Sequence, residues 1–485
     1  MSEKNKENSH FISSIYKFSL ATWINAIIYG IAVLLITLFV DKAIFGLFDL
    51  MLNTANTLMS IVTLGFDYAY LRFWAEPPKG ISDNKQISLL GLIVSGVTLS
   101  AVSIVFFLIP QTIGNIFFNG QREDMLLISM CFTCLAMVVI RFLNIAYRMQ
   151  NNILMFSVAT ILLQFFTRIF YIFGVLISKD FTSIVLFYLS GLVLFILLFI
   201  LLQGKVLIPK RYEIGKEAYA PLFKYSLGIM PSSVLLWGNQ LVSKLFVSAA
   251  LDESALGLFS FATLITSALG VLQGGFASFW SAFMFANYRK EQKRIMDIHD
   301  LLMFIMMMLI CLFLIASPLI FAILSSFSES SQLFGLLLFA PLLMIVSETT
   351  AYGIDIAKKT ILNTLSSLIC VVVNIISCAV LIPPLKLHGA ALAYVISTTV
   401  MFVFRTVIAQ RFYRSIHSYR KTAVSLSVVA VLCFISPLLN DRYIYIAALS
   451  LAAMGFFICF YINEGKLIVS YISGLIAGLR KNREL

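Results

Sequence analysis

Charge is scarce in this chain: Asp, Glu, Lys and Arg together make up only 12% of its 485 residues. Soluble domains carry about 25% charged residues, so this fraction excludes a water-soluble fold for most of the chain. Apolar residues reach 60%, and the mean hydropathy is +0.96. The composition therefore predicts an all-α, polytopic membrane protein, because helices satisfy their own backbone hydrogen bonds in lipid.

The sequence signatures of several enzyme classes are also missing. The chain has no GxxxxGK[ST] phosphate-binding loop, no HExxH zinc motif and no GxSxG motif with triad partners. It has no long polar segment that would house a soluble catalytic domain. We therefore expect neither an enzyme nor an ATP-driven pump, and we expect no metal site and no resident cofactor.

Cysteine and histidine offer little chemistry in this sequence. The seven cysteines all fall in apolar stretches, which predicts small packing residues, and Cys131-x-x-Cys134 lacks the partner ligands of a metal or redox site. The four histidines, His10, His299, His388 and His417, are predicted in loops or at span edges. This placement argues against a histidine proton relay through the membrane.

Apolar windows long enough to cross a bilayer, about 20 residues each, fill most of the chain. Residues 1–17 are polar and the first window is too long for a signal peptide, so we expect it to be retained as a span. Fourteen windows are predicted, near 18–40, 47–71, 87–109, 125–146, 154–177, 182–203, 222–250, 255–284, 301–324, 333–355, 361–383, 388–410, 421–438 and 443–462.

Lys and Arg residues gather in the loops that follow even-numbered spans and in both termini. The opposite loops hold only Lys42, Arg122, Lys179, Lys386 and Arg442. The positive-inside rule therefore predicts that both termini are cytoplasmic. The basic loops 204–220 and 285–300 are explained by this topology beside anionic lipid, so no nucleic-acid partner is expected.

The chain contains two copies of one membrane unit. Ile15-Tyr-Lys-Phe-Ser-Leu20 returns as Leu222-Phe-Lys-Tyr-Ser-Leu227, and after a four-residue insertion Phe45-Gly46-Leu47-Phe48 corresponds to Leu256-Gly257-Leu258-Phe259. Thr37 aligns with Lys244, and Asp49 aligns with Ser260. An even number of spans separates the copies, so they predict two parallel six-helix lobes, over 1–210 and 211–420, with an additional transmembrane hairpin and cytoplasmic tail over 421–485.

Ionisable residues inside spans are costly and are therefore candidates for function. Helical spacing places several of them in polar stripes that also carry amides and aromatic rings. Such a stripe faces either a partner helix, as an interhelical hydrogen bond worth about 1 kcal/mol, or a cavity. We predict a cationic substrate-binding cavity with Arg141, Arg168, Lys244 and Arg405, lined further by Asn25, Tyr29, Asn53, Asn56, Gln164, Trp237 and Gln240.

The carboxylates within spans suggest a second role. Asp67 and Asp355 lie near cytoplasmic ends, where we expect them to pair with Arg72 and Lys358. Glu348 is the deepest carboxylate, and Asp49 shares a helical face with Asn53 and Asn56. Glu348 and Asp49 are the candidates for coupling transport to a counter-transported proton or sodium ion.

The span layout, Phe45-Gly46-Leu47-Phe48 leading to Leu64-Gly65-Phe66-Asp67, and the stretch from Asn374 through Ile382-Pro383 to Gly389-Ala390-Ala391-Leu392-Ala393 together resemble a known group. The chain resembles the polysaccharide transporter, or repeat-unit flippase, branch of the multidrug/oligosaccharidyl-lipid/polysaccharide (MOP) exporter superfamily. The first span lacks the arginine–aspartate pair of the similar lipid II flippases.

The resemblance implies alternating access by two six-helix lobes in a bacterial cytoplasmic (inner) membrane. It implies an undecaprenyl-pyrophosphate-linked oligosaccharide as substrate, carried from the inner to the outer leaflet for O-antigen or capsule synthesis. Expected partners are this substrate, membrane lipids, a polysaccharide polymerase and glycosyltransferases. The alternatives are a multidrug/cation antiporter of the same superfamily and a membrane scaffold of a polysaccharide assembly complex.

Overall fold

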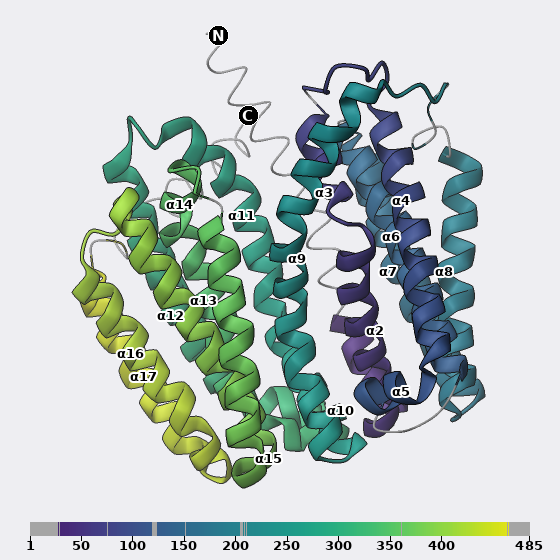
Figure 1. Ribbon diagram of the computed structural model, residues 1–485. Helices are drawn as coiled ribbons and strands as arrows, with labels where there is room; N and C mark the ends of the chain where they lie inside the picture. Colours follow the sequence, from purple (N-terminus) through teal and green to yellow (C-terminus); the bar gives the residue numbers. More distant parts are fainter. Residues whose placement is uncertain are drawn as a thin grey trace, which may run out of the picture. The chain divides into compact units, whose positions relative to one another are not determined.

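The chain folds almost entirely into long helices (Figure 1). The computed structural model describes residues 28, 30–74, 76–118, 124–150, 152–203, 207, 209, 211–359, 361–462 and 464. Within these ranges the only β interaction is an isolated bridge between Ile81 and Ile214, and eleven helices are long and apolar enough to cross a membrane. The all-α polytopic fold is thereby confirmed, while the count of fourteen spans and the side of the termini stay predictions.

The chain divides into two compact units, one of residues 1–261 with 374–390, the other of residues 262–373 with 391–485. The predicted lobes 1–210 and 211–420 and the hairpin 421–485 follow the sequence repeat and stay a prediction. The helices of the first unit are a short helix Gly30–Phe39, α2 Lys42–Val62, α3 Phe66–Phe73, α4 Lys85–Leu108, α5 Pro110–Phe118, α6 Asp124–Met149, α7 Ile153–Ile177, α8 Phe181–Gln203, α9 Lys216–Ala250 and the beginning of α10 Glu253–Thr266.

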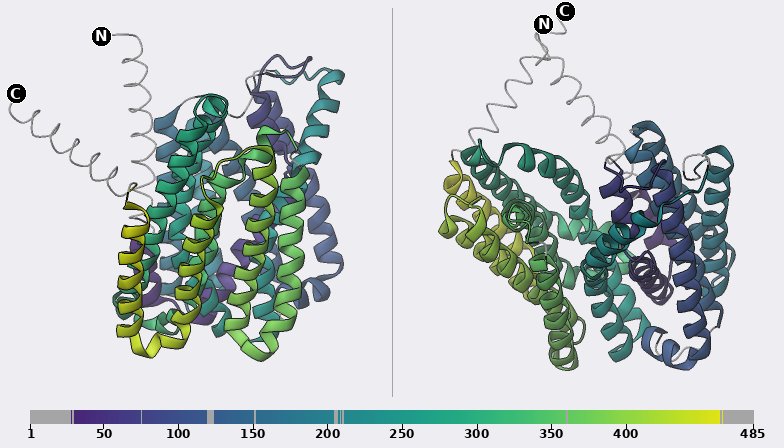
Figure 2. Two further views of the ribbon diagram at one scale, coloured as in Figure 1. Left: turned by 90° about the vertical axis from the view of Figure 1, so that its left-hand side faces the viewer. Right: turned by 45° about the horizontal axis from the view of Figure 1, so that its top comes forward.

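The second unit is built around α13, whose apolar side chains are almost all buried. Its helices are the end of α10, α11 Ala268–Asn287, α12 Gln292–Ile323, η2 Ser325–Ser330, α13 Ser331–Thr350, α14 Tyr352–Ile356, most of α15 Ile361–Phe412, α16 Tyr419–Ile435, η3 Ser436–Arg442 and α17 Tyr443–Phe460. Within the first unit, α6, α7 and α8 run side by side (Figures 1 and 2).

Several predicted spans are interrupted in the structure. The span expected at 47–71 begins at Lys42 and breaks between α2 and α3, where Leu64 and Gly65 have φ of 47° and 78°. A Cβ at Gly65 would overlap the carbonyl oxygen of Ser226 on α9, so this position needs glycine for both its conformation and its close approach. The windows 361–383 and 388–410 fall in α15, which breaks into two helices at Lys386, where φ is 49° and ψ is −125°. Gly389 approaches the carbonyl oxygen of Leu381, so the chain turns back between the two predicted spans.

The two copies of the repeat meet where α2 crosses α10. A Cβ added to Gly46 would lie 2.6 Å from the backbone nitrogen of Gly257, and one added to Gly257 would overlap the carbonyl oxygen of Lys42. One turn away, the rings of Phe45 and Phe261 pack edge to face with centroids 5.9 Å apart. The absence of side chains at the two glycines therefore lets the backbones of the two copies touch.

The loop before α4 forms backbone hydrogen bonds with the segment that precedes α9. The nitrogen of Gly215 donates to the carbonyl of Gly80 at 2.8 Å, beside the bridge of Ile81 to Ile214. The side-chain amide of Gln86 also donates to the carbonyl of Arg211 at 3.1 Å. The end of the linker between the repeat copies is thus held to the first unit by backbone hydrogen bonds.

Candidate functional site

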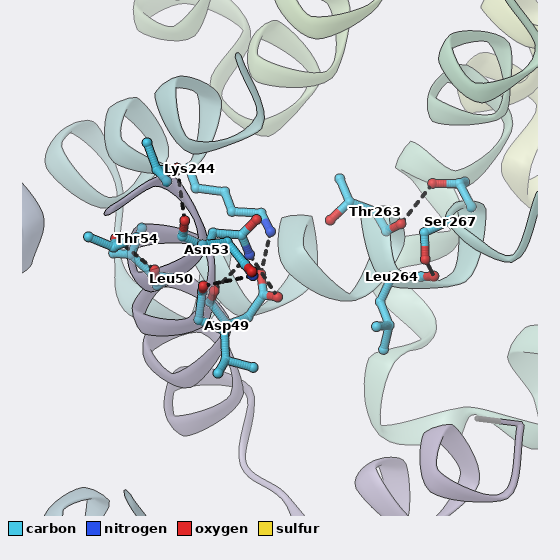
Figure 3. A network of polar contacts seen from close by, with 12 residues as sticks. Asp49, Leu50, Asn53, Thr54, Lys244, Thr263, Leu264 and Ser267 are labelled. Atoms are coloured by element: carbon cyan, nitrogen blue, oxygen red, sulfur yellow. Dashed lines mark hydrogen bonds and ion pairs between the residues drawn. The ribbon is translucent and has the colours of Figure 1, made fainter. Parts of the chain in front are cut away.

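The shortest ion pair of the first unit joins α2 to α9. Lys244 Nζ lies 2.6 Å from Asp49 Oδ2, and the two side chains are 6% and 16% exposed (Figure 3). Asn53, one turn further along α2, donates its amide to Asp49 Oδ1 at 3.2 Å and to the Asp49 carbonyl at 2.8 Å. Charges this deep in apolar surroundings are stable only when they are paired. The sequence assigned Lys244 to the substrate and Asp49 to a coupling ion, whereas the structure pairs them with each other.

A network of uncharged polar side chains lies beside this pair. The side-chain amide of Asn374 donates to the carbonyl of Asn239 at 2.8 Å, and Ser243 Oγ donates to Asn374 Oδ1 at 3.2 Å. All three residues are buried, and Ser243 directly precedes Lys244. The network fixes the rotation of α9 and so the direction of Lys244. Sequence reasoning missed it, although an asparagine within the apolar run of residues 369–376 was a usable signal.

Arg168 lies on α7, close to the Asp49–Lys244 pair. It is half-buried, and both Arg168 and Asp49 act electrostatically on the hydroxyl of Tyr171. Tyr171 is buried and stacks on Phe48, which precedes Asp49, with ring centroids 4.1 Å apart. Gln164 is half-buried one turn before Arg168 on the same helix. Tyr171 therefore brings two of the predicted cations, Arg168 and Lys244, into one region of the first unit.

Arg141 on α6 pairs with Asp67 on α3. Its Nε lies 3.1 Å from Asp67 Oδ2, and the carboxylate is 7% exposed. The predicted pairing of Asp67 with Arg72 is wrong: Arg72 pairs with Glu76 at 3.2 Å. Residues five positions apart do not share a helical face, so the break before α3 leaves Asp67 facing α6 and Arg72 facing outward.

The remaining predicted charges meet in the second unit. Arg405 of α15 acts electrostatically on Glu348 of α13 and on Asp355 of α14. Glu348 Oε1 accepts a hydrogen bond from the amide of Gln273 at 3.0 Å. Asp355 Oδ1 accepts one from Asn363 at 2.8 Å, and the expected ion pair of Asp355 with Lys358 is absent from the described residues. The positive φ of 58° at Lys358 ends the helix and turns this residue away.

The other predicted site residues are spread along their helices. Asn56 donates its amide to the carbonyl of Leu52 at 3.0 Å on its own helix. Trp237 is half-buried and Gln240 is exposed on α9, and in the described part of the chain neither side chain makes a hydrogen bond. Asn25 and Tyr29 lie outside the described residues.

His299 was wrongly placed at a span edge. Helix α12 begins at Gln292, before the predicted window, and His299 is fully buried in it. Its ring nitrogens lie 2.8 Å from Thr349 Oγ1 and 3.1 Å from Thr422 Oγ1, so it links α13 to α16. In the next position, Asp300 lies 3.7 Å from the amine of Lys421, which also pairs with Glu464 at 2.7 Å.

The two units differ in the charges that their helices carry away from the helix ends. Among the residues that the structure describes, the first unit holds three such cations and two such carboxylates: Arg141, Arg168, Lys244, Asp49 and Asp67. In the second unit Arg405 is set against two carboxylates, Glu348 and Asp355. The interior of the first unit is therefore net positive, and the Arg405 cluster of the second is net negative.

Eleven described helices that are long and apolar enough to cross a membrane define a multi-pass membrane protein. The profile of the family described as "Polysaccharide biosynthesis protein" matches residues 13–285, more than half of the sequence. The chain belongs to this polysaccharide biosynthesis protein family. No curated protein matches the sequence significantly.

The fold is similar to that of solved transporters. A structure of the lipid II flippase MurJ in an inward closed conformation superposes with a TM-score of 0.69 at 14% identity, over 92% of this chain and 99% of that chain. Inward-facing and outward-facing structures of a multidrug resistance MATE family transporter of the MOP superfamily each give a TM-score of 0.53 at 14% identity. The inward-facing structure aligns over 80% of this chain and the outward-facing structure over 82%. Each alignment covers 94% of the MATE chain. The chain thus has the fold of these solved transporters.

Proposed function

We propose that this protein flips an undecaprenyl-pyrophosphate-linked oligosaccharide repeat unit from the inner to the outer leaflet of the cytoplasmic membrane. It does so by alternating access, and the product serves synthesis of a surface polysaccharide such as O-antigen or capsule. Membership of the polysaccharide biosynthesis family supports the substrate class. The fold it shares with a lipid II flippase supports flipping of a lipid-linked molecule.

The net positive interior of the first unit is the observation that carries this proposal. Lys244 lies against Asp49, and Arg168 lies near the same Tyr171 as Asp49, so a pyrophosphate or an acidic sugar that enters this region meets two cations. Cations interact strongly with phosphate in surroundings that exclude water. An inside-negative potential also favours outward movement of an anion, by about 2.3 kcal/mol per charge per 100 mV.

The neutral part of the substrate needs a different surface. Trp237 and Gln240 lie one turn apart on α9 and carry no internal hydrogen bond among the described residues. An aromatic ring and a free amide suit the faces and hydroxyl groups of sugars. We assign them to the oligosaccharide, one and two turns before Lys244 on the same helix.

We further propose that the Arg405 cluster couples transport to a proton. The sequence predicted Glu348 and Asp49 as candidates for carrying the coupling ion. Because the charge of Asp49 is neutralised by Lys244, we choose Glu348 as the proton carrier. The carboxylates of Glu348 and Asp355 face amide N–H donors and a guanidinium. Sodium is a hard cation and needs several oxygen ligands. Here N–H groups occupy the carboxylate oxygens, so we propose a proton and not sodium as the coupling ion.

The two alternatives predict different behaviour. A multidrug exporter of cations needs a net negative binding region, opposite to the first unit. A scaffold for a polysaccharide polymerase and glycosyltransferases needs no buried cations, so charge reversal would leave polysaccharide export intact. Both alternatives are outcomes of the test below.

The test is flipping in proteoliposomes of a fluorescent undecaprenyl-pyrophosphate oligosaccharide, followed by quenching from the outside. Arg168→Glu should slow flipping at least tenfold, because it places a negative charge where the substrate anion binds. Lys179→Glu is the matched control, since this exposed cation follows the same helix, and it should flip normally. Equal rates for both variants, or transport of a cationic drug by the wild type alone, would overturn the proposal.

A further inference from the structure

The Asp49–Lys244 ion pair links the two copies of the sequence repeat. Asp49 belongs to α2 of the first copy and Lys244 to α9 of the second, 195 residues apart. Gly46, which contacts Gly257 of the second copy, lies three residues before Asp49 and so on the same side of α2. One backbone contact and one buried ion pair therefore close the same side of the first unit, which the predicted topology places toward the outside.

We propose that Lys244 exchanges its ionic partner during transport, from Asp49 in the closed arrangement seen here to the anionic group of the substrate. This inference rests on the proposed flippase function and concerns how the outer side opens. In the closed arrangement the pair holds α2 against α9. When a pyrophosphate binds Lys244, the ion pair between the two copies is broken and no longer holds α2 against α9.

The exchange is physically reasonable because Lys244 keeps an ionic partner throughout. A pyrophosphate carries more negative charge than one carboxylate, so it competes well for the ammonium group. Asp49 keeps the hydrogen bond from Asn53 after Lys244 leaves. Separating the pair without a replacement would leave both charges buried without an ionic partner, which is strongly unfavourable. The Asp49–Lys244 pair therefore opposes opening of the outer side. A bound substrate anion removes this barrier, and the barrier persists when no substrate is bound.

The Asp49–Lys244 ion pair has no counterpart at the equivalent positions of the repeat. The positions equivalent to Lys244 and Asp49 are Thr37 and Ser260, and the Thr37 hydroxyl donates to the carbonyl of Leu34 on its own helix. No second ion pair can form between these two equivalent positions. Of the two sets of equivalent positions, only Lys244 and Asp49 form a contact that a substrate anion can break.

The experiment measures closure directly. Phe45 and Phe261 pack across the crossing of α2 and α10, so a Phe45→Cys/Phe261→Cys pair, in a chain whose native cysteines are replaced, reports closure by its rate of cross-linking. The probe is undecaprenyl pyrophosphate in lipid nanodiscs, compared with undecaprenol, which lacks the anion. We expect undecaprenyl pyrophosphate alone to slow cross-linking at least threefold.

Three substitutions separate the proposal from a structural role. Asp49→Asn should slow cross-linking without any probe, since the link is weakened. Lys244→Gln weakens the link in the same way, so it too should slow cross-linking without any probe. It should in addition lose the response to undecaprenyl pyrophosphate. Asp67→Asn, which breaks the ion pair with Arg141 in the same unit, should respond like the parent protein.

The outcomes distinguish this inference from the proposed function. If the parent protein flips the oligosaccharide but undecaprenyl pyrophosphate leaves cross-linking unchanged, the exchange is wrong and the function stands. A response that survives in Lys244→Gln also overturns the exchange. Failure of the parent protein to bind or flip the lipid overturns the proposed function itself.

Discussion

Gly46 packs against Gly257, the residue that occupies the same position in the second copy of the sequence repeat. Equivalent residues contact each other only near the axis that relates two copies. We therefore expect the axis that relates the two copies of the repeat to pass near the crossing of α2 and α10. Neither residue tolerates a Cβ without displacement of backbone atoms, so the contact depends on glycine in both copies.

Gly257→Ala should destabilise the protein by about 1–3 kcal/mol, because the added methyl group overlaps the backbone of α2. Gly228→Ala is the matched control on α9, where an added Cβ has no atom within 4 Å. The control should be neutral or slightly stabilising, since alanine favours helix. Thermal unfolding in detergent compares the two, and equal midpoints would show that the glycine contact is unimportant.

Arg141→Met should cost about 3–5 kcal/mol, because it leaves the carboxylate of Asp67 buried without its charged partner. Arg72→Met, which breaks the exposed pair with Glu76, should cost no more than about 1 kcal/mol. The double variant Arg141→Met/Asp67→Leu should recover much of the loss. Unfolding midpoints of the four proteins form the measurement, and a double variant worse than either single change contradicts the pairing.

Glu348→Gln should remove the dependence of flipping on a proton gradient, because glutamine keeps the contact with Gln273 but takes up no proton. In the parent protein, an acidic outer solution should accelerate export, as protons bind outside and leave inside. Replacing sodium by choline should have no effect on the rate. Glu329→Gln, in the exposed helix η2, is the control that should keep the gradient dependence. Persistence of that dependence in Glu348→Gln excludes this residue as the carrier.

Thr422→Val should destabilise the protein by about 1–3 kcal/mol, because it leaves a buried ring nitrogen of His299 without a hydrogen-bond partner. Thr349→Val should act similarly through the other nitrogen. Thr399→Val is the control, since its hydroxyl donates only to the carbonyl of Val395 on its own helix. Unfolding midpoints again decide, and identical behaviour of Thr422→Val and Thr399→Val argues against the bridge.

Composition and apolar windows were sufficient to predict the helical membrane fold, because the bilayer imposes length and polarity on every span. The repeat also pointed to Gly46 and Gly257 as equivalent positions. Breaks within spans were missed: the turn at Leu64 and Gly65 depends on the approach of Ser226 from α9, which no local pattern contains.

The pairing of charges could not be predicted from the sequence. Lys244 finds Asp49 across 195 residues, while the local rule paired Asp67 with Arg72 and was wrong. His299 was misplaced because the exposed cations Lys293 and Arg294 made the first turns of α12 look like a loop. Which residues are ionisable is visible in the sequence, but their partners are set by the packing of distant helices.

The contact of Gly46 with Gly257 also bears on how such a protein arose. An ancestor with a single copy would have set its glycine against the same glycine of a second, identical chain. Every ion pair between two identical chains occurs twice, once on each side of the axis. Only after the copies were fused into one gene could a carboxylate arise at position 49 and an ammonium at position 244 without their mirror counterparts. The asymmetry between the two copies at this crossing is thus a product of the fusion.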